Sequence, residues 1–478
     1  MPLSPPLPAP SGKPRVQRTP HPDELAGREV LLLGLGAFGG GAGCARALAR
    51  RGARLTITDL RPEEQLSESI QELEGIEYRP AFGGHSPELF ERAEVVVVNP
   101  AVPQGASWLQ VARDQGCQLT TQVNLALRLA AQVPAVAITG THGKSSTASL
   151  LHHLLRSLPG RTVLSGNVGG SLLEAVEGLT PQDRLIVELS SFQLERLDAP
   201  QGWPQVALFT CLRPDHLDRH GDMEHYAAAK RRLLEFQNEQ GLALFPRDEA
   251  SLDAFAAAAR GRVERWGSGD LNLARWGADE ADLPWHEDYR LPSLLLAARA
   301  AQEFGLPESE LGAAMRGFRG LPHRLEELPA PAGFRFIDNG IATHPEPTQA
   351  AIESLLPQTA ALSVLVGGYD KGLPLLDLPA SLARCQQVHL FGAGGERIAA
   401  ALPSSSTSVR IHANCADAVH AALAELPAAG GTLLFSPSFA SFDEFRNFRD
   451  RARLFQDFCA RFAGSGKKSP GDAAAGTY

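Results

Sequence analysis

Short apolar, β-branched runs alternate along the chain with longer stretches rich in Ala, Leu and Arg. This alternation predicts parallel sheets covered by helices, which is an α/β protein throughout. The predicted strands are Val30–Leu33, Leu55–Thr58, Val95–Val98, Val136–Thr139, Leu185–Glu188, Val206–Phe209, Phe334–Ile337, Val364–Val366, Val388–Leu390 and Leu433–Phe435. The predicted helices include Ala148–Leu158, Met223–Asn238, Leu291–Phe304 and one around Leu311–Met315, whereas Leu252–Leu291 stays unassigned.

The predicted strands fall into three groups, so we expect three domains. The first group ends near Thr121, before a helix and a new strand that starts at Pro134, and a second break falls at Gly320–His323. The length agrees, because 478 residues correspond to about three domains at roughly 150 residues each. We predict a Rossmann-like domain at 25–121, a central P-loop ATPase-like domain with a parallel sheet at 122–322, a second Rossmann-like domain at 323–464, and disordered tails at 1–24 and 465–478.

Composition narrows the class of protein. The formal charge of −9 lacks the basic excess expected of a nucleic-acid binder, so any bound anion needs a local site. The six cysteines form no C-x-x-C pair, which argues against a zinc site or a dense disulfide framework. The proline-rich start matches neither a signal peptide nor a transmembrane helix, and we expect a cytoplasmic protein.

A glycine-rich turn follows the first predicted strand. Gly34, Gly36 and Gly39 have the G-x-G-x-x-G spacing ahead of an amphipathic helix, and Asp59 closes the next strand. Glycines at this spacing permit a tight turn and bring a phosphate close to a helix N-terminus, while the acidic residue can bind a ribose hydroxyl. A nucleotide site is therefore predicted, although the motif does not say which nucleotide; a glycine-rich turn without a ligand is the alternative.

A second glycine-rich turn is a shortened phosphate-binding loop. It reads G-T-H-G-K-S-S at 140–146, between a strand and the helix Ala148–Leu158. Backbone amides can cradle phosphates, the Lys144 ammonium can neutralise their oxygens, and the Ser145 hydroxyl can ligate Mg²⁺. The full Walker pattern has a glycine where Ile138 stands, and a surface turn beside a solvated lysine is the alternative.

Three more side chains could serve a phosphate site. Glu188 ends a strand in the same domain, where a Mg²⁺ ligand is expected, although a glutamate before two serines can equally cap a helix. His216 follows the strand Val206–Phe209, and Lys230 lies in the helix Met223–Asn238. Histidine prefers softer metals than Mg²⁺. Considered alone, His216 is more simply interpreted as a polar loop residue, and Lys230 is more simply interpreted as a solvated residue on a helix.

Together with the loop, several motifs resemble those of the Mur ligases over about residues 25–462. The motifs are G-T-H-G-K-S-S at 140–146, E-L-S-S-F-Q-L-E at 188–195, D-H-L-D at 215–218, Y-A-A-A-K at 226–230, L-P-H-R at 321–324 and S-P-S-F-A-S-F-D-E-F at 436–445.

The resemblance implies an enzyme of peptidoglycan synthesis that uses ATP to join glutamate to UDP-N-acetylmuramoyl-L-alanine. The γ-phosphoryl group would pass to the alanine carboxylate, and the glutamate amine would attack the resulting acyl phosphate. Two Mg²⁺ ions would offset the negative charge. The implied partners are these small molecules, without nucleic acid or membrane, and we expect a monomer.

The resemblance also carries site roles to positions of this sequence. Lys144, Glu188, His216 and Lys230 would be catalytic. Mg²⁺ would be held by Ser145, Glu188, His216 and Lys230, with Lys230 carbamylated by CO₂ into an oxygen ligand. ATP would contact Gly140, Thr141, His142, Gly143, Lys144, Ser145, Ser146, Arg324 and Asp338. The UDP-sugar would contact Gly36, Ala37, Phe38, Asp59, Asn167 and Gln193, and glutamate would contact Thr343, Lys371, Ser441 and Phe448.

Three segments of the sequence depart from the family pattern. Residues 338–343 read D-N-G-I-A-T in place of N-D-S-K-A-T, which removes a lysine at Ile341 and exchanges an Asp with an Asn. The H-N-x-x-N pattern expected near Leu291–Ala301 is missing, and Asn99-Pro100-Ala101 replaces S-P-G. These departures concern how ATP and glutamate bind more than the type of reaction.

Other functions explain fewer of these residues. A ligase for L-glutamate or another amino acid shares the chemistry, and Lys371 with Ser441 favours D-glutamate. A folylpolyglutamate-type ligase has no place for the N-terminal domain, and a nicotinamide-dependent oxidoreductase leaves Lys144, Glu188 and His216 unused. A non-catalytic UDP-sugar-binding paralogue explains the departures but not the intact central motifs.

Overall fold

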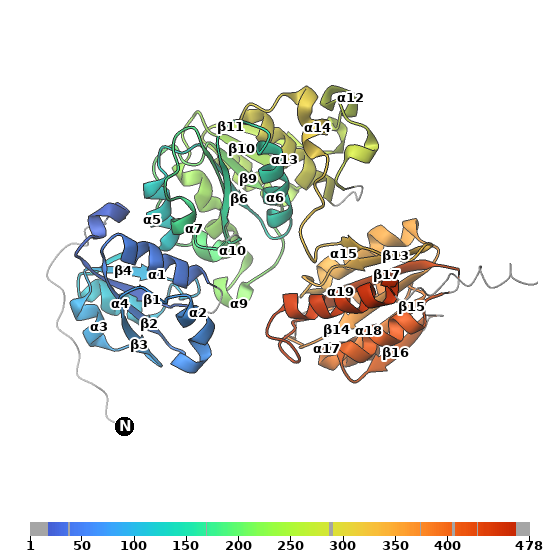
Figure 1. Cartoon of the computed structure of the whole chain (residues 1–478). Coiled ribbons are helices and arrows are strands. Elements are labelled where there is room, and N and C mark those ends of the chain that lie inside the picture. Colours follow the sequence, from blue (N-terminus) through green and yellow to red (C-terminus); the bar gives the residue numbers. More distant parts are fainter. Residues whose placement is uncertain are drawn as a thin grey trace, which may run out of the picture. The chain divides into compact units, whose positions relative to one another are not determined.

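The computed structural model describes residues 18–36, 39–168, 170–285, 290–372, 374–403, 407–427 and 429–464. Contacts divide this chain into two compact units, the first reaching Phe318 and the second starting at Arg319. The first unit contains two parallel sheets and the second contains a mixed sheet (Figure 1). The prediction of an α/β protein with three sheets of helix-covered strands is confirmed.

The first sheet has the strand order β3-β2-β1-β4-β5, with every pair parallel. The order reverses between β1 and β4, and ligands of such sheets bind outside the carboxyl ends of the strands at this reversal. The strands are β1 Glu29–Leu33, β2 Arg54–Asp59, β3 Arg79–Phe82, β4 Val95–Val98 and β5 Gln118–Thr120, and the helices are α1 Gly40–Arg50, α2 Ser67–Gln71, α3 Pro87–Arg92 and α4 Ser107–Asp114.

The central sheet has the order β11-β10-β9-β6-β8-β7 and is also parallel. Its order reverses between β6 and β9, so the loops after these two strands meet. The strands are β6 Ala135–Thr139, β7 Thr162–Gly166, β8 Arg184–Glu188, β9 Val206–Phe209, β10 Leu242–Pro246 and β11 Arg262–Trp266. The helices are α5 Gln122–Leu129, α6 Lys144–Leu155, α7 Leu172–Ala175, α8 Ser191–Leu194, α9 Leu217–His220, α10 Met223–Arg231, α11 Asp253–Ala258, α12 Leu273–Trp276, α13 Leu291–Glu303 and α14 Leu311–Met315.

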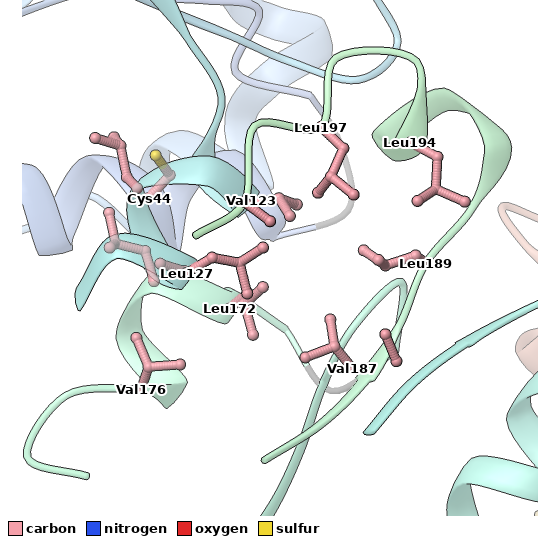
Figure 2. Packing of buried hydrophobic residues seen from close by; sticks show 14 of the residues in the cluster. Cys44, Val123, Leu127, Leu172, Val176, Val187, Leu189, Leu194 and Leu197 are labelled. Atoms are coloured by element: carbon pink, nitrogen blue, oxygen red, sulfur yellow. The ribbon is translucent and has the colours of Figure 1, made fainter. Parts of the chain in front are cut away.

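One hydrophobic core joins the first two sheets. Successive strand residues point to opposite faces, and one face of each sheet contributes to this shared core. Cys44 of α1, Val123 of α5 and Leu172 of α7 meet there with Val187 of β8 (Figure 2). At Gly43 a Cβ would lie 2.4 Å from the Ser171 Cβ, so a glycine is needed for α1 to approach α7. The first two sheets therefore form one body.

The segment 18–24, which was expected in the N-terminal tail, lies against this body. Thr19 is buried, and its amide donates to a carboxylate oxygen of Asp198 (3.1 Å). Pro22–Leu25 forms a short 3₁₀ helix whose Leu25 enters the shared core. The rest of that predicted tail, and the predicted tail at 465–478, lie outside the described residues.

The second unit has the order β12-β13-β17-β14-β15-β16, in which only β12 is antiparallel to its neighbour. Helices α15 to α17 pack on one face, and α18 and α19 pack on the other. The strands are β12 Glu326–Leu328, β13 Phe334–Asp338, β14 Leu362–Gly367, β15 Gln387–Phe391, β16 Ser408–His412 and β17 Gly431–Ser438, and the helices are α15 Pro345–Leu355, α16 Leu378–Leu382, α17 Gly392–Ala401, α18 Cys415–Ala424 and α19 Phe448–Gly464.

Every predicted strand is present, whereas two helix ranges were wrong. Helix α6 starts at Lys144 rather than Ala148, because Gly143 takes the left-handed conformation (φ 81°) directly before it. The α-helical part of the predicted Met223–Asn238 ends at Arg231 and continues as a 3₁₀ turn. Within the described segments, no helix combines the length and apolar character needed to cross a bilayer.

Two histidines on the third sheet give its stability a pH dependence. His389 is 1% exposed, and its Nδ1 lies 3.1 Å from Nε2 of His412 on the neighbouring strand. Burial, with the nearby charges of His412 and Arg410, lowers the pKa of His389 to about 4. The unfolded chain takes up a proton near pH 6.5, so this contribution to stability is complete above that pH and is lost as the pH falls towards 4.

We predict that His389 costs the second unit about 2 kcal/mol of stability between pH 7 and pH 5. Urea unfolding of wild type and His389→Gln at both pH values, with β15 followed by hydrogen exchange, measures this cost. The wild type should lose about 2 kcal/mol more than the variant. An equal loss in both proteins would contradict the buried neutral imidazole.

Candidate functional site

The phosphate-binding loop lies at the reversal point of the central sheet, between β6 and α6. Gly140 has φ 145°, and a Cβ there would lie 1.9 Å from the Thr210 Oγ1 that follows β9. The Thr141 amide donates to the Cys211 carbonyl (2.9 Å), which ties the loops after β6 and β9 together. The loop is thus a tight turn that ends at the N-terminus of a twelve-residue helix, where amides and the helix dipole favour an anion.

Two lysines donate to the same carbonyl of this loop. Lys144 Nζ lies 2.9 Å and Lys230 Nζ 2.8 Å from the Gly140 oxygen. Lys230 is 2% exposed and lies over the Tyr226 ring, 4.6 Å from its centre. Burial, together with the Lys144 ammonium, holds the pKa of Lys230 well below its usual value. The simpler interpretation of Lys230 as a solvated helix residue is therefore wrong.

Glu188 ends β8 with its side chain fully buried. Asn167 Nδ2 donates to its Oε1 (2.9 Å), whereas its Oε2 has no hydrogen-bond partner among the described residues. The helix that follows is capped by Ser190 and Gln193, so Glu188 is not the helix cap that the sequence also allowed. A buried carboxylate oxygen without a donor is costly, and a cation is the ligand that would satisfy it.

The other two predicted metal ligands lie on neighbouring loops. Ser145 is half-buried in the first turn of α6. His216 is exposed and stands directly before α9 in the left-handed conformation (φ 53°). Its ring lies 4.8 Å from the Phe192 ring, and its Nε2 lies 3.4 Å from a carboxylate oxygen of Asp215. The oxygen donors of Ser145 and Glu188 suit Mg²⁺, whereas an imidazole suits softer metals, so His216 stays a predicted ligand.

The N-terminal fingerprint forms the expected turn after β1. Gly34, Gly36 and Gly39 all have positive φ. The Gly36 amide donates to Asp59 (3.1 Å), and Arg61 donates to both oxygens of the same carboxylate. Burial opposes ionisation of Asp59, but these hydrogen bonds hold its pKa below the usual value. The predicted contacts Ala37 and Phe38 lie outside the described residues.

In the second unit, loops after three strands form a shallow pocket. Thr343 follows β13, Lys371 follows β14, and Ser438 ends β17, and all three line it. Sequence reasoning missed Ser438, whose backbone is left-handed (φ 67°) and whose buried Oγ has no hydrogen-bond partner among the described residues. Ser441 is buried nearby in the chain and outside the pocket lining.

The remaining predicted contacts of this unit lie elsewhere. Phe448 packs edge-on against His323, with ring centres 6.3 Å apart. Asp338 is fully buried, and its carboxylate contacts His323 Nδ1 (2.7 Å) and accepts from Gln456 and the Gly340 amide. These bonds use both oxygens of Asp338. Because Asp338 is fully buried, a direct ATP contact stays a prediction that would require this carboxylate to become accessible.

An open surface pocket lies away from the motifs. This pocket of about 430 Å³ lies at the amino ends of the central strands, lined by Pro134, Pro159, Gly160, Pro181, Gln182, Asp183, Arg184 and Phe304. None of the predicted site residues lines it. Parallel sheets bind ligands at the opposite, carboxyl edge, so the candidate site is the loop region built around Lys144, Glu188 and Lys230.

Both parts of the first unit match known protein families, and related proteins match nearly the whole chain. Residues 28–121 match the family described as "Mur ligase MurD-like, N-terminal domain", and residues 138–284 match "Mur ligase middle domain". The UDP-N-acetylmuramoylalanine--D-glutamate ligase of Geobacter metallireducens is 34% identical over 452 residues, which are 91% of this chain and 97% of that protein. The enzyme of the same name from Roseiflexus sp. is 34% identical over 472 residues, 92% of this chain and all of that protein.

Solved structures share the fold at low identity. The UDP-N-acetylmuramate-alanine ligase MurC of Thermotoga maritima has a TM-score of 0.59 at 16% identity, over 92% of this chain and 100% of that one. The MurF ligase of Thermotoga maritima in complex with ADP has a TM-score of 0.57 at 15% identity, over 86% of this chain and 95% of that one.

The tight turn at Gly140 predicts a specific loss on substitution. In Gly140→Ala the added Cβ collides with Thr210, so the loop must open and binding of an ATP analogue should weaken at least about tenfold, or ~1.4 kcal/mol. Gly178→Ala is the matched control, because its φ is also positive (66°) but no atom lies within 4 Å of the added Cβ. Calorimetric titration should show the loss in the first variant alone; unchanged affinity in Gly140→Ala would refute the described loop.

Proposed function

This chain belongs to the Mur ligase family, and on that premise we propose that it is an ATP-dependent amide ligase that joins D-glutamate to UDP-N-acetylmuramoyl-L-alanine in peptidoglycan precursor synthesis. The curated relatives carry that activity in their names and match along nearly their whole length. The proposal includes a monomer that works in the cytoplasm. It also includes the three-domain division at 25–121, 122–322 and 323–464.

One observation supports this function most strongly. Beside a phosphate-binding loop, the buried Glu188 has an oxygen to which no residue of the described chain donates, and the buried Lys230 donates to the loop itself. A nucleotide-binding fold without catalysis has no need of either group, since burying both is costly. A site for phosphoryl transfer needs both kinds of group, because metal ions and fixed charges must offset the charge on the moving phosphoryl.

ATP is the phosphoryl donor in this proposal. The amides of residues 140–146 would hold its phosphates, with Lys144 turning from the Gly140 and Thr141 carbonyls to the phosphate oxygens. The alanine carboxylate of the UDP-sugar attacks the γ-phosphorus, ADP leaves, and an acyl phosphate forms. The D-glutamate amine then attacks the acyl carbon and phosphate leaves, so that an amide bond replaces the mixed anhydride and the amine loses a proton.

The donor set fits Mg²⁺, and Ser145, Glu188, His216 and Lys230 are the residues that would hold it. When bound, Mg²⁺ neutralises phosphate oxygens and orients them for in-line transfer. Asn167 keeps the Glu188 carboxylate oriented through its hydrogen bond of 2.9 Å.

Lys230 would serve as a carbamate. Because its pKa is held well below the usual value, a neutral amine is available to attack CO₂. The N–C bond forms, one proton leaves, and a group with two oxygens and a negative charge replaces the cation. That change relieves the repulsion from Lys144 and turns Lys230 into a ligand suited to Mg²⁺.

The two outer sites would hold the other substrates. The UDP-sugar would lie over the turn of Gly36 with Asp59, and reach Asn167 and Gln193 at its muramoyl-alanine end. In the second unit, Lys371 and Thr343 would bind carboxylates of D-glutamate at the pocket, and Ser441 and Phe448, which lie outside its lining, would be further contacts. Ser438 also lines that pocket, and its hydroxyl, which has no hydrogen-bond partner in the described part of the chain, could donate to a substrate carboxylate.

Two alternatives stay open to experiment. A ligase of the same type could add L-glutamate or another amino acid, because side-chain identity does not fix stereochemistry. A non-catalytic UDP-sugar-binding paralogue would account for Ile341 in place of the family lysine, but it leaves the buried Glu188 and Lys230 without a purpose.

We predict ATP-dependent phosphate release when the purified protein receives Mg²⁺, UDP-N-acetylmuramoyl-L-alanine and D-glutamate. Release with L-glutamate should be at least about tenfold slower at equal concentration, since the two isomers cannot place both carboxylates and the amine alike. Removal of Mg²⁺ with EDTA should stop the reaction. No phosphate release with either isomer would refute the proposed ligase activity. Faster release with L-glutamate would show that L-glutamate, and not D-glutamate, is the substrate.

A further inference from the structure

Helix α9, which follows His216, has little of its own to hold it. The helix has four residues, and none of them is classed as buried. The residues on either side of it, His216 (φ 53°) and Gly221 (φ 85°), have positive φ angles. A single helical turn is unstable in isolation, because it fixes more torsions than its hydrogen bonds repay. The position of His216 therefore depends on side chains that anchor the helix.

Arg219 is the main anchor of α9. Its Nη1 donates to the Ala101 carbonyl (2.9 Å), and its Nη2 donates to the carbonyls of Pro100 (3.1 Å) and Val102 (3.0 Å). Its side chain is only 11% exposed. One guanidinium thus binds three consecutive carbonyls of the loop after β4, which belongs to the first sheet.

The other side of Arg219 is fixed by the central sheet's own loops. Glu195 forms a two-point ion pair with it (2.8 and 3.3 Å), and Phe192 lies under the guanidinium, 4.6 Å from its carbon. The same Phe192 ring contacts the His216 ring. His220 adds a contact to Ser191 Oγ (3.0 Å). The planar guanidinium of Arg219 has five N–H donors, which suits these contacts to several acceptors and to a ring face. A lysine ammonium has three donors and could make only some of these contacts.

The loop that Arg219 binds continues into the first nucleotide-binding turn. Asn99 Nδ2 donates to the Gly34 carbonyl (3.1 Å), and its own carbonyl accepts from the Val102 amide (3.0 Å). Because the first two sheets share one core, both ends of this connection belong to one body. The contacts therefore run without a break from the Gly34–Gly36 turn through Asn99 and Arg219 to His216.

We propose that Arg219 is a positioning residue, which sets the place of His216 relative to the substrate-binding turn of the first domain. This inference rests on the proposed function, because it assigns the purpose of the arrangement to metal binding by His216. Arg219 would hold α9 in place whether or not His216 binds a metal, so this anchoring role is measured separately.

The test compares wild type with Arg219→Lys, which keeps the charge but loses the planar fork. In the apo protein, hydrogen exchange of a peptide covering 214–222 should become at least about tenfold faster, while exchange of β6 and β8 is unchanged. Binding of Mn²⁺ with a non-hydrolysable ATP analogue, followed by electron paramagnetic resonance, should weaken about tenfold, as for other residues that orient a metal ligand. Glu195→Gln should show the same two effects more weakly, and serves if Arg219→Lys does not fold.

Arg196→Lys is the matched control. Arg196 also donates to the Val102 carbonyl (3.0 Å) but does not belong to α9, so both measurements should stay at wild-type values. Unchanged exchange in Arg219→Lys, or faster exchange with unchanged Mn²⁺ affinity, overturns the proposal. If wild type itself binds no Mn²⁺ with the analogue, the proposed function fails, and the exchange measurement still decides whether Arg219 holds α9.

Discussion

The candidate site depends on two buried ionisable side chains beside the phosphate-binding loop. Lys230 shares the Gly140 carbonyl with Lys144, and no described residue donates to one oxygen of Glu188. Removing such groups from water costs several kcal/mol each unless they are paired. Among the described residues neither group has an oppositely charged hydrogen-bond partner, so a ligand that brings charge of its own would offset the cost of their burial. The surrounding turns hold the two groups at the place where those ligands arrive.

Parallel sheets explain why the loops meet. In the central sheet, the strand order reverses between β6 and β9, and the contact between Gly140 and Thr210 lies directly above that reversal. In the first sheet, the same rule brings Gly34 and Asn99 together after β1 and β4. A core shared by α1, α5 and α7 joins these two sheets into one body. The Gly34–Gly36 turn and the phosphate-binding loop therefore belong to one compact unit, in which Arg219 joins the helix after His216 to the loop after β4.

Sequence patterns predicted the α/β class and the buried strands, because apolar β-branched runs leave few other structures open. They missed β3, β5, β7, β10, β11, β12 and β16; the run Leu242–Pro246 of β10 is buried but has no β-branched residue, and most residues of β16 lie exposed at a sheet edge. The phosphate loop was predictable from glycine spacing alone. Lys230 was not, since its burial depends on packing against Tyr226, and only the family resemblance pointed to it. Ser438 carried no local signal, because its left-handed backbone and unpaired hydroxyl arise from the fold around it.

In the proposed function, Lys230 does not remain an ammonium ion when the enzyme works. Carbon-13 NMR of the protein in ¹³C-bicarbonate tests this most directly, with Mg²⁺, ADP and the UDP-sugar present to complete the site. The account predicts one slowly exchanging carbamate signal that is absent in Lys230→Arg, whose guanidinium cannot add CO₂. A spectrum with bicarbonate alone, identical in wild type and variant, would contradict the claim and leave Lys230 as a cation.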